Sequence, residues 1–134
     1  MVARISRTLL NEILEHADRN AAQEVCGLLL GEGGRIVSAQ RVANVASNPA
    51  DRFEIDPAAL FAQARAERAG GARMIGHYHS HPNGRAAPSA MDAAAVTDPA
   101  MLWLIVANGA ATLWRADDPH GLHGCFAAME LAID

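Results

Sequence analysis

A seven-residue apolar run, Val25–Gly31 (VCGLLLG), constrains the fold of this chain more than any other feature. The run is short, carries no charge and is bounded by glycines, which predicts a buried strand. Before it, Ser6–Arg19 repeats apolar residues at helical spacing. After it, Arg35–Val45 alternates apolar and polar residues as a second strand does. A helix followed by neighbouring strands therefore opens the chain.

The rest of the chain continues this alternation of helices and strands. The patterns predict a short strand at Arg52–Ile55, a helix from Asp56-Pro57 to Gly70-Gly71, a strand at Met74–His81, a helix at Ser89–Thr97, strands at Leu102–Ala107 and Thr112–Arg115 around an Asn108-Gly109 turn, and a strand or helix at Phe126–Ile133. In the second helix we expect Leu60, Phe61 and Ala64 to face the core. This order predicts a single α/β domain over residues 1–134, with a mixed β-sheet flanked by helices.

Composition excludes several classes of function. The chain has 11 basic residues, all of them Arg, against 15 acidic ones, and its formal net charge is −4. No basic cluster is present, so we expect neither a nucleic-acid partner nor an anionic membrane surface. No membrane span and no signal peptide is evident in the sequence. Cys26 and Cys125 form no CxxC pair, which excludes a zinc site of that type and favours a soluble, cytoplasmic protein.

Three histidines fall within five residues, at positions His77, His79 and His81. On a strand, alternate residues face the same side and lie roughly 6.5 Å apart. The imidazoles of His79 and His81 can therefore converge on one metal ion. His77 shares that face, and we expect it to pack or hydrogen-bond beneath His79 rather than to bind the ion.

Two interpretations of Ser89 and Asp92, which begin the next predicted helix, remain open. A serine followed three residues later by an acidic residue is typical of a capping box, in which both side chains bind backbone N–H groups. Residues three apart also share a helix face, so both side chains can look back at the histidines. Two histidines and one carboxylate, with one open position, form the ligand set of a catalytic zinc site.

Glu24 immediately precedes the apolar run, where a glutamate is most often simply solvated. A zinc site of this kind needs a carboxylate base for its water, and Glu24 is the candidate. Cys26 lies inside the run with no base beside it, so we expect a core residue rather than a nucleophile.

Together these residues resemble the signature of the JAMM (MPN-plus; Mov34/MPN/PAD-1) zinc metallopeptidases. That signature is an upstream Glu, then His-x-His-Pro, a short loop and Ser-x-x-Asp. The chain carries Glu24, His79-Ser80-His81-Pro82 and Ser89-Ala90-Met91-Asp92 in this order. The strings EVCGLL, FEIDP and GHYHSHP extend the resemblance over residues 6–115, and they are similar to the small bacterial branch of the family.

The resemblance implies a fold and a set of roles. The fold would be the JAMM fold, which is similar to that of the cytidine deaminases. His79, His81 and Asp92 would bind one Zn²⁺ per chain, with water in the fourth position. Glu24 would act as the general base for that water, and Ser89 would hydrogen-bond the oxyanion.

The implied activity is hydrolysis of an amide or isopeptide bond after the C-terminal Gly-Gly tail of a ubiquitin-like protein. The chain has no room for the inserted segments with which eukaryotic deubiquitinating members hold a second ubiquitin, so we expect a ubiquitin-like sulfur-carrier protein as substrate. A non-catalytic scaffold of the same family is the alternative, although such scaffolds have lost the ligands. A zinc deaminase would need a Pro-Cys-x-x-Cys motif, which is absent. The sequence favours neither a monomer nor a homodimer.

Overall fold

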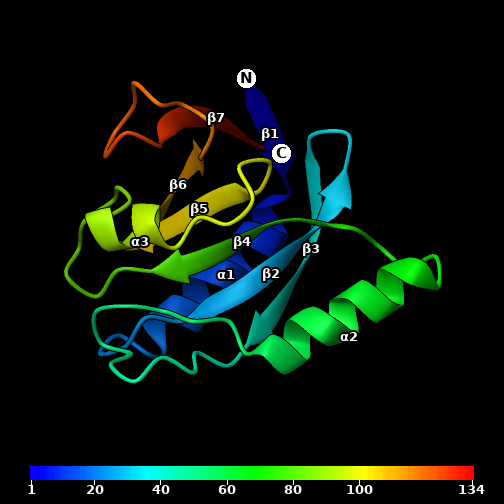
Figure 1. Ribbon diagram of the computed structural model, residues 1–134, viewed down its shortest axis with the longest axis horizontal. Helices are drawn as coiled ribbons and strands as arrows, with labels where there is room; N and C mark the ends of the chain where they lie inside the picture. Colours follow the sequence, from blue (N-terminus) through cyan, green and yellow to red (C-terminus); the bar gives the residue numbers. More distant parts are fainter.

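The computed structural model describes residues 1–134, which form seven β-strands and three α-helices (Figure 1). The strands are β1 (Val2–Ile5), β2 (Cys26–Glu32), β3 (Arg35–Val42), β4 (Met74–Ser80), β5 (Leu102–Ala107), β6 (Ala110–Arg115) and β7 (Ala127–Ile133). The helices are α1 (Arg7–Asp18), α2 (Pro57–Arg68) and α3 (Ala90–Ala94). None of the helices is long and apolar enough to cross a membrane.

The strands form one mixed sheet in the order β1-β3-β2-β4-β5-β6-β7, and β7 pairs with β1 to close a barrel. The pairs β1–β3, β1–β7 and β4–β5 are parallel, and the other neighbours are antiparallel. The mixed α/β architecture predicted from the sequence is thereby confirmed. Strand β1 was not predicted, because four residues give too short a pattern to recognise.

Helix α1 covers one face of the sheet. The hydroxyl of Ser6 accepts a hydrogen bond from the backbone N–H of Leu9 (3.1 Å) and so caps the helix. Leu9, Leu10 and Ile13 are buried, and they form one apolar cluster with residues of the strands, among them Tyr78 of β4. The helical spacing in the sequence thus marks the side of α1 that packs on the sheet.

Strand β4 carries different residues on its two faces. Tyr78 faces α1, where its hydroxyl shares a hydrogen bond with Nδ1 of His16 (2.6 Å). His77 and His79 face the other side, where both rings meet the indole of Trp103 on β5. The two-residue period of a strand therefore separates the core from a histidine-bearing face.

Helix α2 packs differently from the prediction. The expectation that Leu60, Phe61 and Ala64 face the core is wrong, because Leu60 and Phe61 are 40% and 72% exposed and Ala64 is also exposed. The one buried residue of the helix is Gln63, whose amide donates a hydrogen bond to the carbonyl of Ala72 (2.8 Å). Figure 1 shows α2 extending beside the sheet, and most residues of this helix are exposed.

Two further segments differ from the sequence predictions, and a third settles a prediction that was ambiguous between strand and helix. Residues 52–55 make only a single bridge, Asn44 to Ile55, because the Asn44 side chain takes the backbone N–H of Glu54 (3.0 Å). Helix α3 ends at Ala94, short of the predicted Thr97. The ambiguous segment near the C-terminus forms strand β7.

Candidate metal centre

Three ligand atoms meet at the carboxyl end of β4. Nε2 of His79 lies 3.0 Å from Nε2 of His81, and Oδ2 of Asp92 lies 3.3 Å and 3.2 Å from these two nitrogens. All three side chains are buried. The structure therefore brings together the three residues that the sequence pattern suggested as metal ligands, although Asp92 comes from the start of α3, 13 residues after His79.

A backbone carbonyl fixes the tautomer of His81. Nδ1 of His81 donates a hydrogen bond to the carbonyl oxygen of Arg85 (2.8 Å), because a carbonyl can only accept. In the neutral ring, Nε2 then carries a lone pair, which faces His79 and Asp92. The main chain of Arg85 thus prepares His81 to bind a cation.

Asp92 serves the helix and the cluster at once. Its Oδ2 accepts a hydrogen bond from the backbone N–H of Ser89 (2.9 Å), while Oγ of Ser89 accepts one from the backbone N–H of Asp92 (3.0 Å). This is a complete capping box, and the same Oδ2 faces both histidines. The two interpretations left open by the sequence are therefore compatible. The Ser89 hydroxyl proton is donated to no protein group, so it is free for a ligand.

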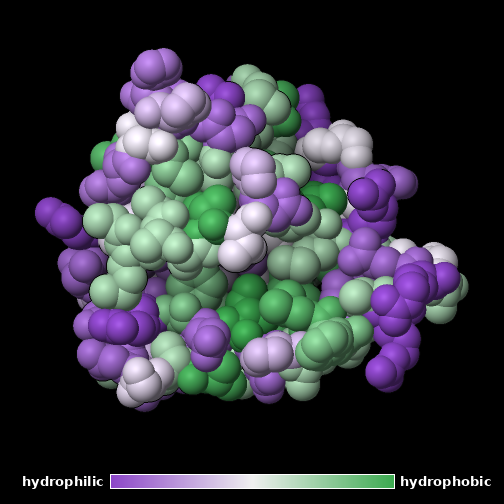
Figure 2. Space-filling model, in the orientation of Figure 1, coloured by the Kyte–Doolittle hydropathy of each residue, from purple (hydrophilic) through white to green (hydrophobic).

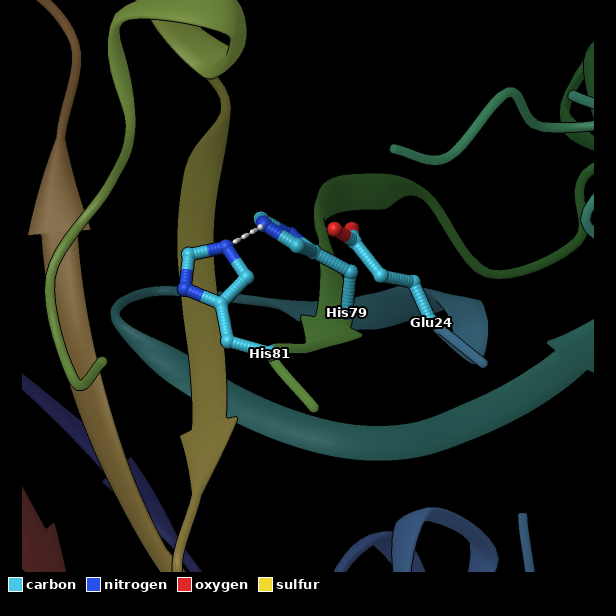
Figure 3. A group of neighbouring side chains, drawn as sticks. All are labelled: Glu24, His79 and His81. Carbon is cyan, nitrogen blue, oxygen red and sulfur yellow. Dashed lines mark hydrogen bonds between the residues drawn. The ribbon is translucent and has the colours of Figure 1, made fainter. Parts of the chain in front are cut away.

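Glu24 lies just before β2, with its carboxylate directed toward the two imidazoles (Figure 3). Ligand atoms of Glu24, His79 and His81 all lie within 4.8 Å of one another, and these three residues form a cluster that can hold a metal ion. Ser80, between the histidines, accepts a hydrogen bond from the backbone N–H of Val25 (2.9 Å). This bond ties the end of β4 to the residue after Glu24 and so fixes the carboxylate relative to the rings.

The two carboxylates differ in their electrostatics. Burial alone would raise the pKa of Asp92, but its contacts with the imidazoles of His79 and His81, together with the hydrogen bond from the Ser89 N–H, hold the pKa of its carboxyl well below its usual range. Burial raises the pKa of Glu24 to about 7; His81 opposes this shift and Asp92 adds to it. A metal ligand must be ionised, whereas a general base works best with a pKa near the working pH. Asp92 is therefore an ionised carboxylate beside the histidines, whereas Glu24 is a carboxyl group whose pKa lies close to neutral pH.

The donor set fits a zinc ion. Zinc takes imidazole nitrogen and carboxylate oxygen at about 2.0–2.1 Å, and in a tetrahedral site such ligands lie about 3.3 Å apart. The three atoms contributed by His79, His81 and Asp92 lie 3.0–3.3 Å apart. Burial lowers the pKa of His79 and keeps its ring neutral, as a metal-binding imidazole must be. Burial lowers the pKa of His81, but Asp92 and the Arg85 carbonyl raise it on balance, so the space between His81 and Asp92 favours a positive charge, which either a proton or a metal ion can supply.

His77 does not reach the three ligand atoms. Its ring packs against the edge of Trp103, with centroids 4.3 Å apart and planes at 72°, and it makes no hydrogen bond to His79. Its Nδ1 is buried without a partner, and burial lowers the pKa of His77 to about 3. His77 thus packs beneath the cluster, as expected, but it does not hold His79 through a hydrogen bond.

A cavity of about 630 Å³ opens beside the cluster. Its lining includes Phe53, Leu60, His77, Met101 and Trp103. Figure 2 shows apolar residues gathered in the lower middle of this face, where α2 begins. The exposed apolar side of α2 is therefore continuous with a cavity that ends at the rings around the metal ligands.

Three contacts that hold the residues of the centre in place were not predicted from the sequence. The strand alternation contained a signal for Ser80, since it places this residue on the face opposite the histidines. The contacts of Phe53 and of the Arg85 carbonyl had no signal, because each depends on how a loop folds back on the strand. Cys26 was assigned correctly: it is fully buried, and burial raises the pKa of its thiol to about 12, so it is a core residue.

The raised pKa of Glu24 predicts a pH-dependent stability of the metal-free protein. Because its pKa is about 7 in the folded state and near 4.5 in the unfolded state, wild-type stability should fall as the pH rises from 4.5 to 7. Glu24→Gln removes this loss. In chelator-treated protein, the free energy of unfolding of Glu24→Gln should exceed that of the wild type by more at pH 8 than at pH 5, as measured by urea denaturation. The exposed Glu54→Gln is the matched control, and an equal gain there would contradict the assignment to Glu24.

Comparisons with known proteins show what the chain is similar to. The family model of prokaryotic homologs of the JAB domain matches residues 6–117. A desampylase of Haloferax volcanii is 34% identical over 117 residues, which cover 81% of this chain and 84% of that protein. A probable TtuB-protein conjugate cleaving protease of Thermus thermophilus is 35% identical over 94 residues, and the match covers 69% of this chain but only 62% of that protein.

Solved structures show the same fold. A protein from Desulfitobacterium hafniense superposes with a TM-score of 0.82 at 24% identity, and the match covers 100% of this chain and 93% of that one. A JAB1/MPN domain protein from Archaeoglobus fulgidus superposes with a TM-score of 0.63 at 21% identity and 98% coverage of both chains. The match of the family model over most of the sequence, together with this common fold, identifies the chain: it belongs to the prokaryotic homologs of the JAB domain.

Proposed function

We propose that this protein is a zinc-dependent peptidase of the JAMM type. On this proposal it hydrolyses the amide or isopeptide bond after the C-terminal Gly-Gly tail of a ubiquitin-like or sulfur-carrier protein. The observation that carries the proposal is the convergence of His79 Nε2, His81 Nε2 and Asp92 Oδ2 within 3.0–3.3 Å. A non-catalytic scaffold would not need three buried ligand atoms in this geometry.

Each residue of the centre has a role in this proposal. His79, His81 and Asp92 would hold the ion. A zinc ion bound there lowers the pKa of its water to about 7 and polarises the scissile carbonyl. Glu24 takes a proton from the attacking water and returns it to the leaving amine, and its pKa of about 7 suits both transfers. The free hydroxyl proton of Ser89 is available to hydrogen-bond the oxyanion that develops on the carbonyl.

The names of the relatives support the substrate class. The Haloferax protein is a desampylase, and the Thermus protein is a probable protease that cleaves TtuB-protein conjugates. The apolar cavity beside the centre is large enough for substrate residues next to the scissile bond. We further infer that residues 1–134 form one metallopeptidase domain and that it acts in the cytoplasm, which its two free cysteines favour.

Incubation of the zinc-loaded protein with ubiquitin-like proteins of its host, each extended beyond the Gly-Gly tail, tests the proposal. Mass spectrometry should detect cleavage directly after the second glycine. Removal of zinc by a chelator should stop the reaction, and added zinc should restore it. Absence of cleavage of every such substrate by zinc-loaded protein would contradict the proposed substrate class.

Ser89→Ala separates the catalytic role of Ser89 from its capping role. Loss of an oxyanion donor should lower kcat by about 10²–10³-fold while zinc affinity stays unchanged. Loss of the cap should also lower the free energy of unfolding by about 0.5–2 kcal/mol. Ser6→Ala, which removes the cap of α1, is the matched control: it should lower stability without lowering kcat. If Ser89→Ala behaves like Ser6→Ala in both measurements, Ser89 is only a cap.

A further inference from the structure

The two histidines of the centre are held in different ways. The ring of His81 is fixed by the hydrogen bond from its Nδ1 to the carbonyl of Arg85 (2.8 Å). Nδ1 of His79 is buried and has no hydrogen-bond partner, although the side chain is completely inaccessible to solvent. Metal-binding histidines are generally oriented by an acceptor at the second ring nitrogen. Some other contact must therefore orient His79.

An aromatic ring packs against the imidazole of His79, which lacks this hydrogen bond. The ring of Phe53 lies parallel to the imidazole of His79, with centroids 4.2 Å apart and planes at 19°. Trp103 meets the same imidazole edge-on, at 5.7 Å and 85°. The two rings thus form a corner that leaves the imidazole only one plane in which to lie.

We propose that Phe53 is a positioning residue: its stacked ring replaces the usual hydrogen bond and holds His79 with Nε2 toward His81 and Asp92. This inference rests on the proposed function, because it assumes that His79 binds zinc. The ring contacts of Phe53 are with His77, His79 and Trp103 and not with His81, so we infer that it acts on the metal through the imidazole of His79.

Phe53 can hold a ring in place because its own segment is anchored. The side-chain oxygen of Asn44 accepts a hydrogen bond from the backbone N–H of Glu54 (3.0 Å), and the backbone N–H of Val45 donates to the carbonyl of Glu54 (2.9 Å). The amide of Asn44 also donates to the carbonyl of Glu24 (2.9 Å). One asparagine therefore fixes the loop that carries the stacking ring and the residue that carries the base.

The other surroundings of Phe53 give the stack a second consequence. Phe53 also lines the cavity beside the centre, together with His77 and Trp103. A substrate residue in that cavity contacts the ring that orients His79. The stacking ring thus stands between bound substrate and a metal ligand.

Three variants test the inference: Phe53→Leu, Phe53→Tyr and Phe126→Leu. Phe53→Leu keeps an apolar side chain but removes the stack, whereas Phe53→Tyr keeps an aromatic face. Phe126 is the matched control, because it is buried and packs on Trp103 (5.1 Å) without contacting His79. Zinc affinity is measured by competition with a chromophoric chelator, and the ligand geometry by the absorption bands of the cobalt-substituted protein.

We expect Phe53→Leu to weaken zinc binding by about 2- to 10-fold, the range that one aromatic pair supplies, and to change the cobalt spectrum. Phe53→Tyr should keep the zinc affinity and the cobalt spectrum of the wild type. Phe126→Leu should lower the Tm and leave zinc affinity and the cobalt spectrum unchanged.

Wild-type affinity and spectrum in Phe53→Leu would overturn the inference, and so would an equal loss of affinity in Phe126→Leu. If the wild type binds zinc and Phe53→Leu weakens it, but no Gly-Gly substrate is cleaved, the inference stands and the proposed function fails. If the wild type binds no zinc, both fail.

Discussion

Asp92→Asn is expected to abolish zinc binding and hydrolysis together while leaving helix α3 in place. The asparagine side-chain oxygen can still accept the hydrogen bond from the Ser89 N–H, so the capping box persists. The negative charge that faces His79 and His81 is lost, and with it the third ligand. Loss of residues that only support a ligand costs 10- to 100-fold in metal affinity, so loss of the ligand itself should cost more than about 100-fold.

Titration with zinc against a chromophoric chelator measures the affinity, and circular dichroism verifies the fold. Asp56→Asn is the matched control, because Asp56 caps α2 by accepting a hydrogen bond from the backbone N–H of Ala58 (3.0 Å) and is not part of the metal cluster. It should bind zinc and turn over substrate as the wild type does. Wild-type zinc affinity in Asp92→Asn would show that Asp92 is only a helix cap and would contradict the proposed ligand set.

Glu24→Gln should retain zinc and lose turnover. Glutamine has the shape of glutamate but cannot accept a proton from water, and a positioned general base contributes about 10²–10⁴-fold to the rate. We therefore expect kcat to fall by about 10³-fold with an unchanged zinc content. Metal analysis of the purified variant and a cleavage assay on the same sample measure the two quantities.

The result also decides which of the two carboxylates near the histidines, Glu24 or Asp92, is the third metal ligand. Glu24, His79 and His81 by themselves could hold an ion, since their ligand atoms lie within 4.8 Å of one another. If Glu24→Gln loses zinc as well as activity, Glu24 is a ligand rather than the base. Full activity in this variant would refute the base assignment. The exposed Glu12→Gln, on α1, provides the reference for a change remote from the cluster and the cavity.

The sequence predicted the parts of the fold that depend on local periodicity. The alternation in Met74–His81 places His79 and His81 on one face of a strand and Tyr78 on the other, as the structure has them. Helical spacing left the approach of Asp92 to these histidines as one of two interpretations, and the place of Glu24 beside them followed from the family resemblance rather than from periodicity. The structure then showed that Asp92 also caps its helix.

The parts that the sequence did not predict depend on tertiary contacts. Leu60 and Phe61 have the spacing of a buried helix face, but α2 lies beside the sheet and leaves them exposed. Phe53 meets His79 only because the Asn44 side chain folds its loop back toward β4. No local pattern encodes where a loop or an edge helix packs, so these contacts could not be predicted from the sequence.

The pairing of β1 with β7 has a consequence for how the protein folds during synthesis. Val2 of β1 pairs with Glu130 of β7, so closure of the barrel brings together residues from nearly opposite ends of the sequence. Contacts this distant cost the most chain entropy and tend to form late. The segment that contains Glu24, His79, His81 and Asp92 is synthesised before residues 127–133 exist, and the nascent chain must keep the barrel open until they are made.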